Sequence, residues 1–222
     1  MSGSAERFRD AALEMTNEAI DAFIERGECD LVGELTTPLP ARLILRLMNF
    51  DESRYLDWVH CVHTVVHDRA HDPEKAGAAG MEMFGEIVKH MEERRAEGLG
   101  DDLFSDILRG TLNDEPPDDG QITMYTVLMM MGGMDTTSGL TGNALLQMIQ
   151  RPRLREQLIE RPELLKSATE EFLRHSTSTL GLLGVVWAGL ASIGRLLRRR
   201  AALSCSPRRS ARFPLNWHGN AG

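Results

Sequence analysis

Apolar residues recur every three or four positions along most of the chain, a spacing that predicts amphipathic helices rather than strands. Over 6–26 these positions are Phe8, Ala12, Met15, Ala19, Ala22 and Phe23. Gly27 follows and is expected to end this helix, because glycine readily adopts the left-handed conformation found just after helix C-termini. No alternating strand pattern accompanies the helical one, so the sequence predicts an all-α body.

Prolines, glycines and aspartates divide the next part of the chain into further helices. Asp51 is a candidate N-cap, Asp72-Pro73 separates two helices, and Gly98-Leu99-Gly100 stops the second of them. These boundaries predict helices over 41–48, 53–70, 73–97 and 101–109, followed by a solvated loop over 113–118.

A long apolar segment over 121–150 contains no proline and a single charged residue, Asp135. Asp118 and Asp119 precede it as candidate N-caps, and Pro152 follows its end. We therefore expect one buried helix of about 30 residues, roughly 45 Å long. Its centre holds Gly132-Gly133-Met134-Asp135-Thr136-Thr137. A buried carboxylate and two helical glycines each cost stability, which indicates that this point of the helix is used for chemistry.

A second motif follows two Arg-Pro pairs, Arg151-Pro152 and Arg161-Pro162. It is Ala168-Thr169-Glu170-Glu171-Phe172-Leu173-Arg174, in which Glu171 and Arg174 are three residues apart. Residues with this spacing share a helix face, so the two side chains can form an ion pair.

Together the two motifs resemble those of the cytochrome P450 family, haem-thiolate monooxygenases of the bacterial type. The first resembles the family's Ala/Gly-Gly-x-Asp/Glu-Thr-Thr helix, and the second its Glu-x-x-Arg helix at the usual distance. The resemblance extends over roughly 6–176. It implies the mainly helical body of a cytochrome P450 fold, truncated at both ends, with the family's β-sheet and cysteine loop missing.

The resemblance also implies roles for particular residues. Asp135 and Thr136 would be catalytic, supplying protons to dioxygen as it is reduced. Gly132 and Gly133 would open the helix beside the haem, which Thr136 would also contact. A purely structural alternative is a helix kink in which Thr136 bonds the carbonyl four residues earlier.

The resemblance implies substrate-binding and structural roles for four more residues. Leu128 and Met131, within two turns before Asp135, would contact substrate. Methionines at helical spacing are more often core residues, and here both roles are compatible with an apolar pocket. Glu171 and Arg174 would form a structural ion pair, which without the resemblance would be an ordinary surface salt bridge.

An intact relative would hydroxylate a small apolar organic substrate with dioxygen, two electrons and haem b. The electrons would come from a ferredoxin or flavoprotein reductase, and we expect neither nucleic acid nor membrane as a partner. Three cysteines without paired spacing (Cys29, Cys61, Cys205) favour a reducing compartment, and 1–7 lacks the apolar region of a signal peptide. These features predict a cytoplasmic protein.

Four histidines follow one stripe, His60, His63, His67 and His71. Imidazoles four residues apart can bind zinc, nickel or copper, so a non-catalytic helical scaffold that binds metal is the alternative function. No Glu or Cys completes the stripe, and the sequence therefore predicts no metal site.

Composition changes sharply after Glu171, beyond which there is no acidic residue. The later stretch holds eight arginines and no lysine, so the totals of 25 basic and 33 acidic residues leave 17 and 33 up to Glu171, a net charge of −16 against +8. We expect a partial cytochrome P450 domain over 1–176 and an unrelated, disordered tail over 177–222, encoded out of frame.

Two features of that tail have plain explanations. Its Cys205 lacks the surrounding Phe-x-x-Gly-x-x-x-Cys-x-Gly loop that would present a thiolate to iron, so this chain is not expected to be active alone. Its apolar run over 180–194 is shorter than the roughly 20 residues that span a bilayer.

Overall fold

The computed structural model describes residues 2–176 of the 222-residue chain. The expected tail over 177–222, with Cys205 and the apolar run over 180–194, lies outside the described residues. The described residues divide into two compact units, one ending at Ser138 and the other beginning at Gly139.

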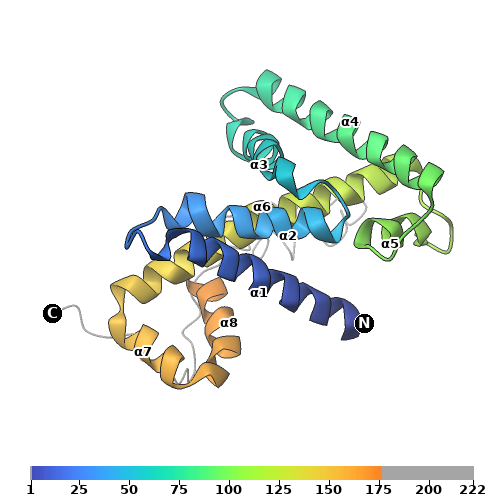
Figure 1. Ribbon diagram of the computed structural model, residues 1–222. Coiled ribbons are helices and arrows are strands. Elements are labelled where there is room, and N and C mark those ends of the chain that lie inside the picture. The colour runs from blue at the N-terminus through green and yellow to red at the C-terminus, as the bar shows by residue number, and fades with distance from the viewer. Residues whose placement is uncertain (1, 177–222) are drawn as a thin grey trace, which may run out of the picture. The chain divides into compact units, whose positions relative to one another are not determined.

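Helices make up the described part of the chain, in which no strand occurs and the single isolated bridge joins Leu112 to Glu115 (Figure 1). This confirms the all-α prediction. In chain order the elements are α1 (Ser2–Ile24), π-helix η1 (Val32–Thr36), α2 (Pro38–Leu47), 3₁₀-helix η2 (Glu52–Arg54), α3 (Tyr55–His63), π-helix η3 (Thr64–Asp68), α4 (Pro73–Glu97), α5 (Leu103–Arg109), α6 (Asp119–Gln150), α7 (Pro152–Glu160), 3₁₀-helix η4 (Pro162–Leu164) and α8 (Leu165–His175).

Side-chain caps and glycines explain the best-predicted boundaries. The Asp72 carboxylate accepts a hydrogen bond from the Lys75 amide at 3.0 Å, and Gly98 follows α4 with φ +100°. Asp118 and Gln121 form a reciprocal capping box before α6, with bonds of 2.8 and 2.9 Å. Each device satisfies backbone groups that a helix end leaves without partners.

The single helix predicted over 53–70 is wrong. Three short elements, η2, α3 and η3, occupy this segment, and the last turn is π-helical. Thr64, Val65 and Val66 are β-branched, and such residues lose side-chain freedom in a regular α-helix. The wider π-helical turn η3 begins at these three residues.

In unit 1, α1 packs on α2, α2 packs on α3, and α3 with η3 packs on α4. The first part of α6 closes the core through Ile122, Met130 and Met134. The other fully enclosed core side chains include Leu45, Met48, Val62, Ile87, Met91 and Phe104. This packing fixes the glycine-containing turn of α6 beside α2.

Unit 2 has its own smaller core. Leu154 and Leu158 of α7 pack with Ala168 and Phe172 of α8. The part of α6 that belongs to this unit adds partly buried side chains, Leu140, Ala144 and Met148. This core supports the turn of α8 that carries Glu171.

The expected buried helix over 121–150 is buried along one side only. Its buried residues, Ile122, Thr123, Thr126, Met130 and Met134, follow one stripe. Apolar residues off that stripe are exposed, namely Met124, Tyr125, Leu128, Met129, Leu146 and Ile149. Within residues 2–176, no helix is both long and apolar enough to cross a membrane.

Candidate functional site

The glycine-containing turn of α6 is tied to Thr136. The Thr136 hydroxyl donates a hydrogen bond of 2.6 Å to the Gly132 carbonyl, one turn earlier. This is the bond that the structural alternative predicts, although α6 runs through this turn as an uninterrupted α-helix. Because the hydroxyl donates its proton to the carbonyl, its oxygen can still accept a hydrogen bond from another donor.

The two glycines have different surroundings. A Cβ atom added at Gly132 would meet no heavy atom within 4 Å, whereas one added at Gly133 would lie 3.2 Å from Ile44 Cγ1 of α2. Gly132 therefore lies on an open side of α6, and Gly133 allows α2 to approach closely. The family motif that this turn resembles, which accepts alanine at the first position but not the second, has the same asymmetry.

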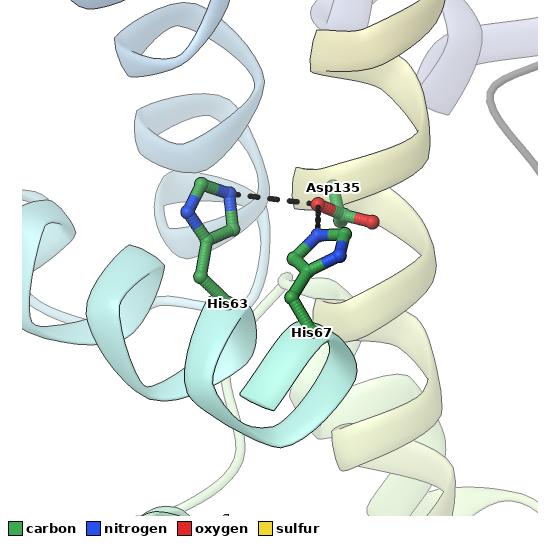
Figure 2. Close-up of side chains that lie close together, drawn as sticks. All are labelled: His63, His67 and Asp135. Atoms are coloured by element: carbon green, nitrogen blue, oxygen red, sulfur yellow. Dashed lines mark hydrogen bonds and ion pairs between the residues drawn. The ribbon is translucent and has the colours of Figure 1, made fainter. Parts of the chain in front are cut away.

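Asp135 is held by two histidines from another segment (Figure 2). Its Oδ1 atom lies 3.0 Å from His67 Nε2 and 3.5 Å from His63 Nε2. The Asp135 side chain is 22% exposed, so its carboxylate is largely withdrawn from solvent but not deeply buried. Polar partners compensate for that partial burial.

Only two of the four histidines in the predicted stripe lie beside Asp135 in the structure. His63 ends α3 and His67 lies in η3, with their ring centroids 5.5 Å apart and their planes at 75°. His60 and His71 are exposed and do not join this group. Asp135 completes the group from a position 68 residues beyond His67, which explains why inspection of the stripe alone missed it.

The expected substrate residues differ in exposure. Leu128 is 66% exposed, whereas Met131 is partly buried and packs against the core of unit 1. An exposed leucine can contact a ligand without repacking the core. Met131 already has a packing role, so any substrate contact would use the remaining part of its side chain.

The Glu171–Arg174 ion pair forms within α8. Arg174 Nε lies 2.7 Å from Glu171 Oε2, and the guanidinium makes a second, shorter contact with Oε1. Hydrogen bonding to Glu171 raises the pKa of Arg174. Glu171 is buried at 3% exposure, so the pair is not the ordinary surface salt bridge of the structural alternative.

A haem-thiolate site needs an open surface beside this helix and an ionised sulfur. The open side of Gly132 and the adjacent hydroxyl of Thr136 suit the first requirement. The second is not met by Cys61, because burial raises the pKa of its thiol to about 11 and keeps it protonated. Cys29 lies in the loop after α1, outside any Phe-x-x-Gly-x-x-x-Cys-x-Gly sequence. The described residues thus fit one side of a haem and supply no axial thiolate.

The described body is helical and carries both motifs, the Asp-Thr pair in α6 and the Glu-x-x-Arg pair in α8. Comparison with known proteins identifies the family to which they belong. The profile of the family described as "Cytochrome P450" matches residues 42–165. The chain belongs to the cytochrome P450 family, which consists of oxidoreductases of the monooxygenase type.

Individual relatives show the extent of the similarity. The chain is 32% identical over 180 residues to a putative cytochrome P450 133B2 of Xylella fastidiosa, covering 78% of this chain and 45% of the relative. It is 29% identical over 164 residues to cytochrome P450 107B1 of Saccharopolyspora erythraea, covering 74% and 40%. The chain thus spans less than half the length of these relatives.

A solved structure confirms the fold. The cytochrome P450 PksS of the Bacillus subtilis 168 bacillaene polyketide synthase superposes with a TM-score of 0.72. The superposition covers 77% of this chain and 44% of that one, at 23% identity.

Proposed function

We propose that this chain carries the proton-delivery helix of a haem b-dependent monooxygenase that hydroxylates a small apolar organic substrate. In that reaction the substrate and dioxygen, with two electrons and two protons, give the alcohol and water. The electrons would come from a ferredoxin or flavoprotein reductase. When bound, the haem would supply the activation of dioxygen, and this chain's residues would supply the protons.

One observation carries the proposal: the Thr136 hydroxyl is fixed on the open turn of α6 that begins at Gly132. Its anchored oxygen can accept a hydrogen bond from a water molecule and hold that water at the open side. Asp135 is the next residue, and adjacent helical side chains point about 100° apart. A proton would therefore pass between the two side chains through water rather than directly.

The two histidines would connect this proton route to solvent. His63 and His67 are 47% and 59% exposed, and both touch the partly buried Asp135 carboxylate. Imidazole can both accept and donate a proton, which suits it to shuttle protons between solvent and a carboxylate. The proposed order is solvent, imidazole, Asp135, water and then the site held by Thr136.

We also propose that the chain is not competent alone, because neither described cysteine can serve as the axial thiolate. The activity is accordingly tested by grafting 6–176 into a full-length relative. The proposed assignment of 1–176 to the monooxygenase domain and of 177–222 to an unrelated segment determines where the graft ends.

Two substitutions in the graft separate the proposed roles. Asp135→Asn should slow turnover, because it interrupts proton supply and leaves the Thr136 hydroxyl in place. Thr136→Ala should instead preserve electron consumption while more oxygen leaves as hydrogen peroxide. Proton-transfer assistance is typically worth about 10²–10⁴-fold, so either effect should greatly exceed any change in substrate binding. Unchanged turnover in Asp135→Asn would refute its assignment as the proton donor.

A further inference from the structure

Three potential metal ligands converge between the end of α3 and the centre of α6. His63, His67 and Asp135 each offer one ligand atom, and these atoms all lie within 4.8 Å of one another. The Nε2 atoms of both rings face the Asp135 carboxylate (Figure 2). We propose that these three residues bind a divalent first-row transition ion of the zinc type. The site extends beyond the proposed monooxygenase function and requires no haem.

The distances suit such an ion. Zinc binds histidine nitrogen and carboxylate oxygen at about 2.0–2.2 Å, so two ligands at a tetrahedral angle are roughly 3.3 Å apart. The two nitrogen–oxygen separations here are 3.0 and 3.5 Å. Both imidazoles are about half exposed and can rotate slightly to bring the third ligand pair to the same spacing.

The backbone holds the two histidines on one side. His63 is the residue that precedes η3, and His67 is the fourth residue of this π-helical turn. A four-residue separation in a helical turn places the rings on the same face, where they lie edge to face at 5.5 Å.

The ligand types select the metal class. Two imidazoles and one carboxylate form a set found in catalytic zinc sites, which leave a fourth position open to solvent. Calcium prefers six to eight oxygen ligands and magnesium six, so neither ion is favoured here. The nearby Asp68 carboxylate is bonded to Lys75 Nζ at 2.8 Å and is not the fourth ligand. That position is left to water or an exogenous ligand.

Metal binding would fix the tautomers of the two rings. In the bond between His67 Nε2 and Asp135 Oδ1, an ionised carboxylate can only accept, so the ring nitrogen bonded to it would carry the proton. With an ion, both Nε2 lone pairs must face the metal, which places the ring proton of each neutral histidine on Nδ1. Because Asp135 is shared, a bound ion would also occupy the carboxylate that the proposed proton route uses.

The test is titration of the full chain with Co²⁺, followed by visible absorption, and displacement of Co²⁺ by Zn²⁺. Three variants remove one ligand each, His63→Gln, His67→Gln and Asp135→Asn. Two matched controls, His60→Gln and His71→Gln, alter the same histidine stripe outside the cluster. Circular dichroism checks that every variant keeps its helical content.

We expect the wild-type chain to bind one Co²⁺ that Zn²⁺ displaces. Each ligand variant should lose at least about tenfold in affinity, and each control should stay within about twofold of wild type. Absence of binding by the wild-type chain overturns the proposal. Undiminished binding by Asp135→Asn, whose amide preserves the shape of the side chain, also overturns it. Thr136→Ala should bind Co²⁺ like wild type, so failure of the monooxygenase proposal and failure of this one are distinguishable.

Discussion

Replacing each glycine of the α6 turn by alanine should change the stability by different amounts. Gly→Ala inside a helix gains about 0.5–1 kcal/mol, because glycine loses more backbone freedom on folding. At Gly132 the new methyl group meets no heavy atom within 4 Å, so this gain should appear in full. At Gly133 the methyl group would lie 3.2 Å from Cγ1, 3.4 Å from Cδ1 and 3.5 Å from Cβ of Ile44.

The contact at Gly133 requires a shift of a few tenths of an ångström. Attractive carbon–carbon contacts lie at about 3.5–4.0 Å, and Ile44 is a buried, β-branched side chain with little freedom to move. Overpacking of a core typically costs about 1–3 kcal/mol. The helical gain is common to both variants, so Gly133→Ala should be about 1–3 kcal/mol less stable than Gly132→Ala.

Urea denaturation of the full chain, followed by far-ultraviolet circular dichroism, measures this difference. A double-mutant cycle with Ile44→Val tests its cause, because the smaller side chain lacks Cδ1 and is freer to shift. The Ile44→Val change should cost at least about 0.5 kcal/mol less in the Gly133→Ala background than in wild type. Equal stability of the two alanine variants would refute the different roles assigned to the two glycines.

Two further predictions concern charged groups away from this turn. Burial lowers the pKa of His90, which packs against Phe50 and Phe104, so the unfolded chain binds a proton there more readily than the folded chain. The free energy of unfolding should therefore fall as the pH drops below about 6.5. His90→Gln should weaken this pH dependence in urea denaturation between pH 7.5 and 5, and the same pH dependence in variant and wild type would contradict the prediction. Arg174→Gln removes the guanidinium that pairs with the buried Glu171 and should lower the thermal unfolding midpoint. The control Arg153→Gln, at an exposed arginine, should leave the midpoint unchanged. Equal midpoints for the two variants would show that the Glu171–Arg174 pair is not structural.

Local sequence signals predicted those parts of the fold that depend on neighbouring residues. The bounds of α4 match 73–97 because Asp72-Pro73 and Gly98 act within one turn of its ends. The start of α6 follows from the capping residue Asp118 in the same way. The π-helical η3 was missed, since the hydrophobic spacing of its sequence is compatible with a continuous α-helix.

Long-range packing decided what the sequence could not predict. The apolar composition of 121–150 indicated a buried helix, but which of its faces are buried depends on the elements that pack against them. The contact of Gly133 with Ile44 joins segments that no local pattern relates. The same is true of Asp135, whose histidine partners are in a segment predicted independently of it. The motif located the important turn of α6, and the structure identified its neighbours.

The central claim is that the Thr136 hydroxyl holds the proton-delivering water, and the product formed per electron consumed tests it most directly. In the full-length graft, Thr136→Ser keeps a hydroxyl, Thr136→Ala removes it, and Thr137→Ala removes the neighbouring hydroxyl as a control. We predict that Thr136→Ser and Thr137→Ala retain most of the wild-type yield, while Thr136→Ala diverts oxygen to hydrogen peroxide. If Thr136→Ala gives the same yield per electron as Thr136→Ser, the hydroxyl has no catalytic role and its bond to Gly132 is structural.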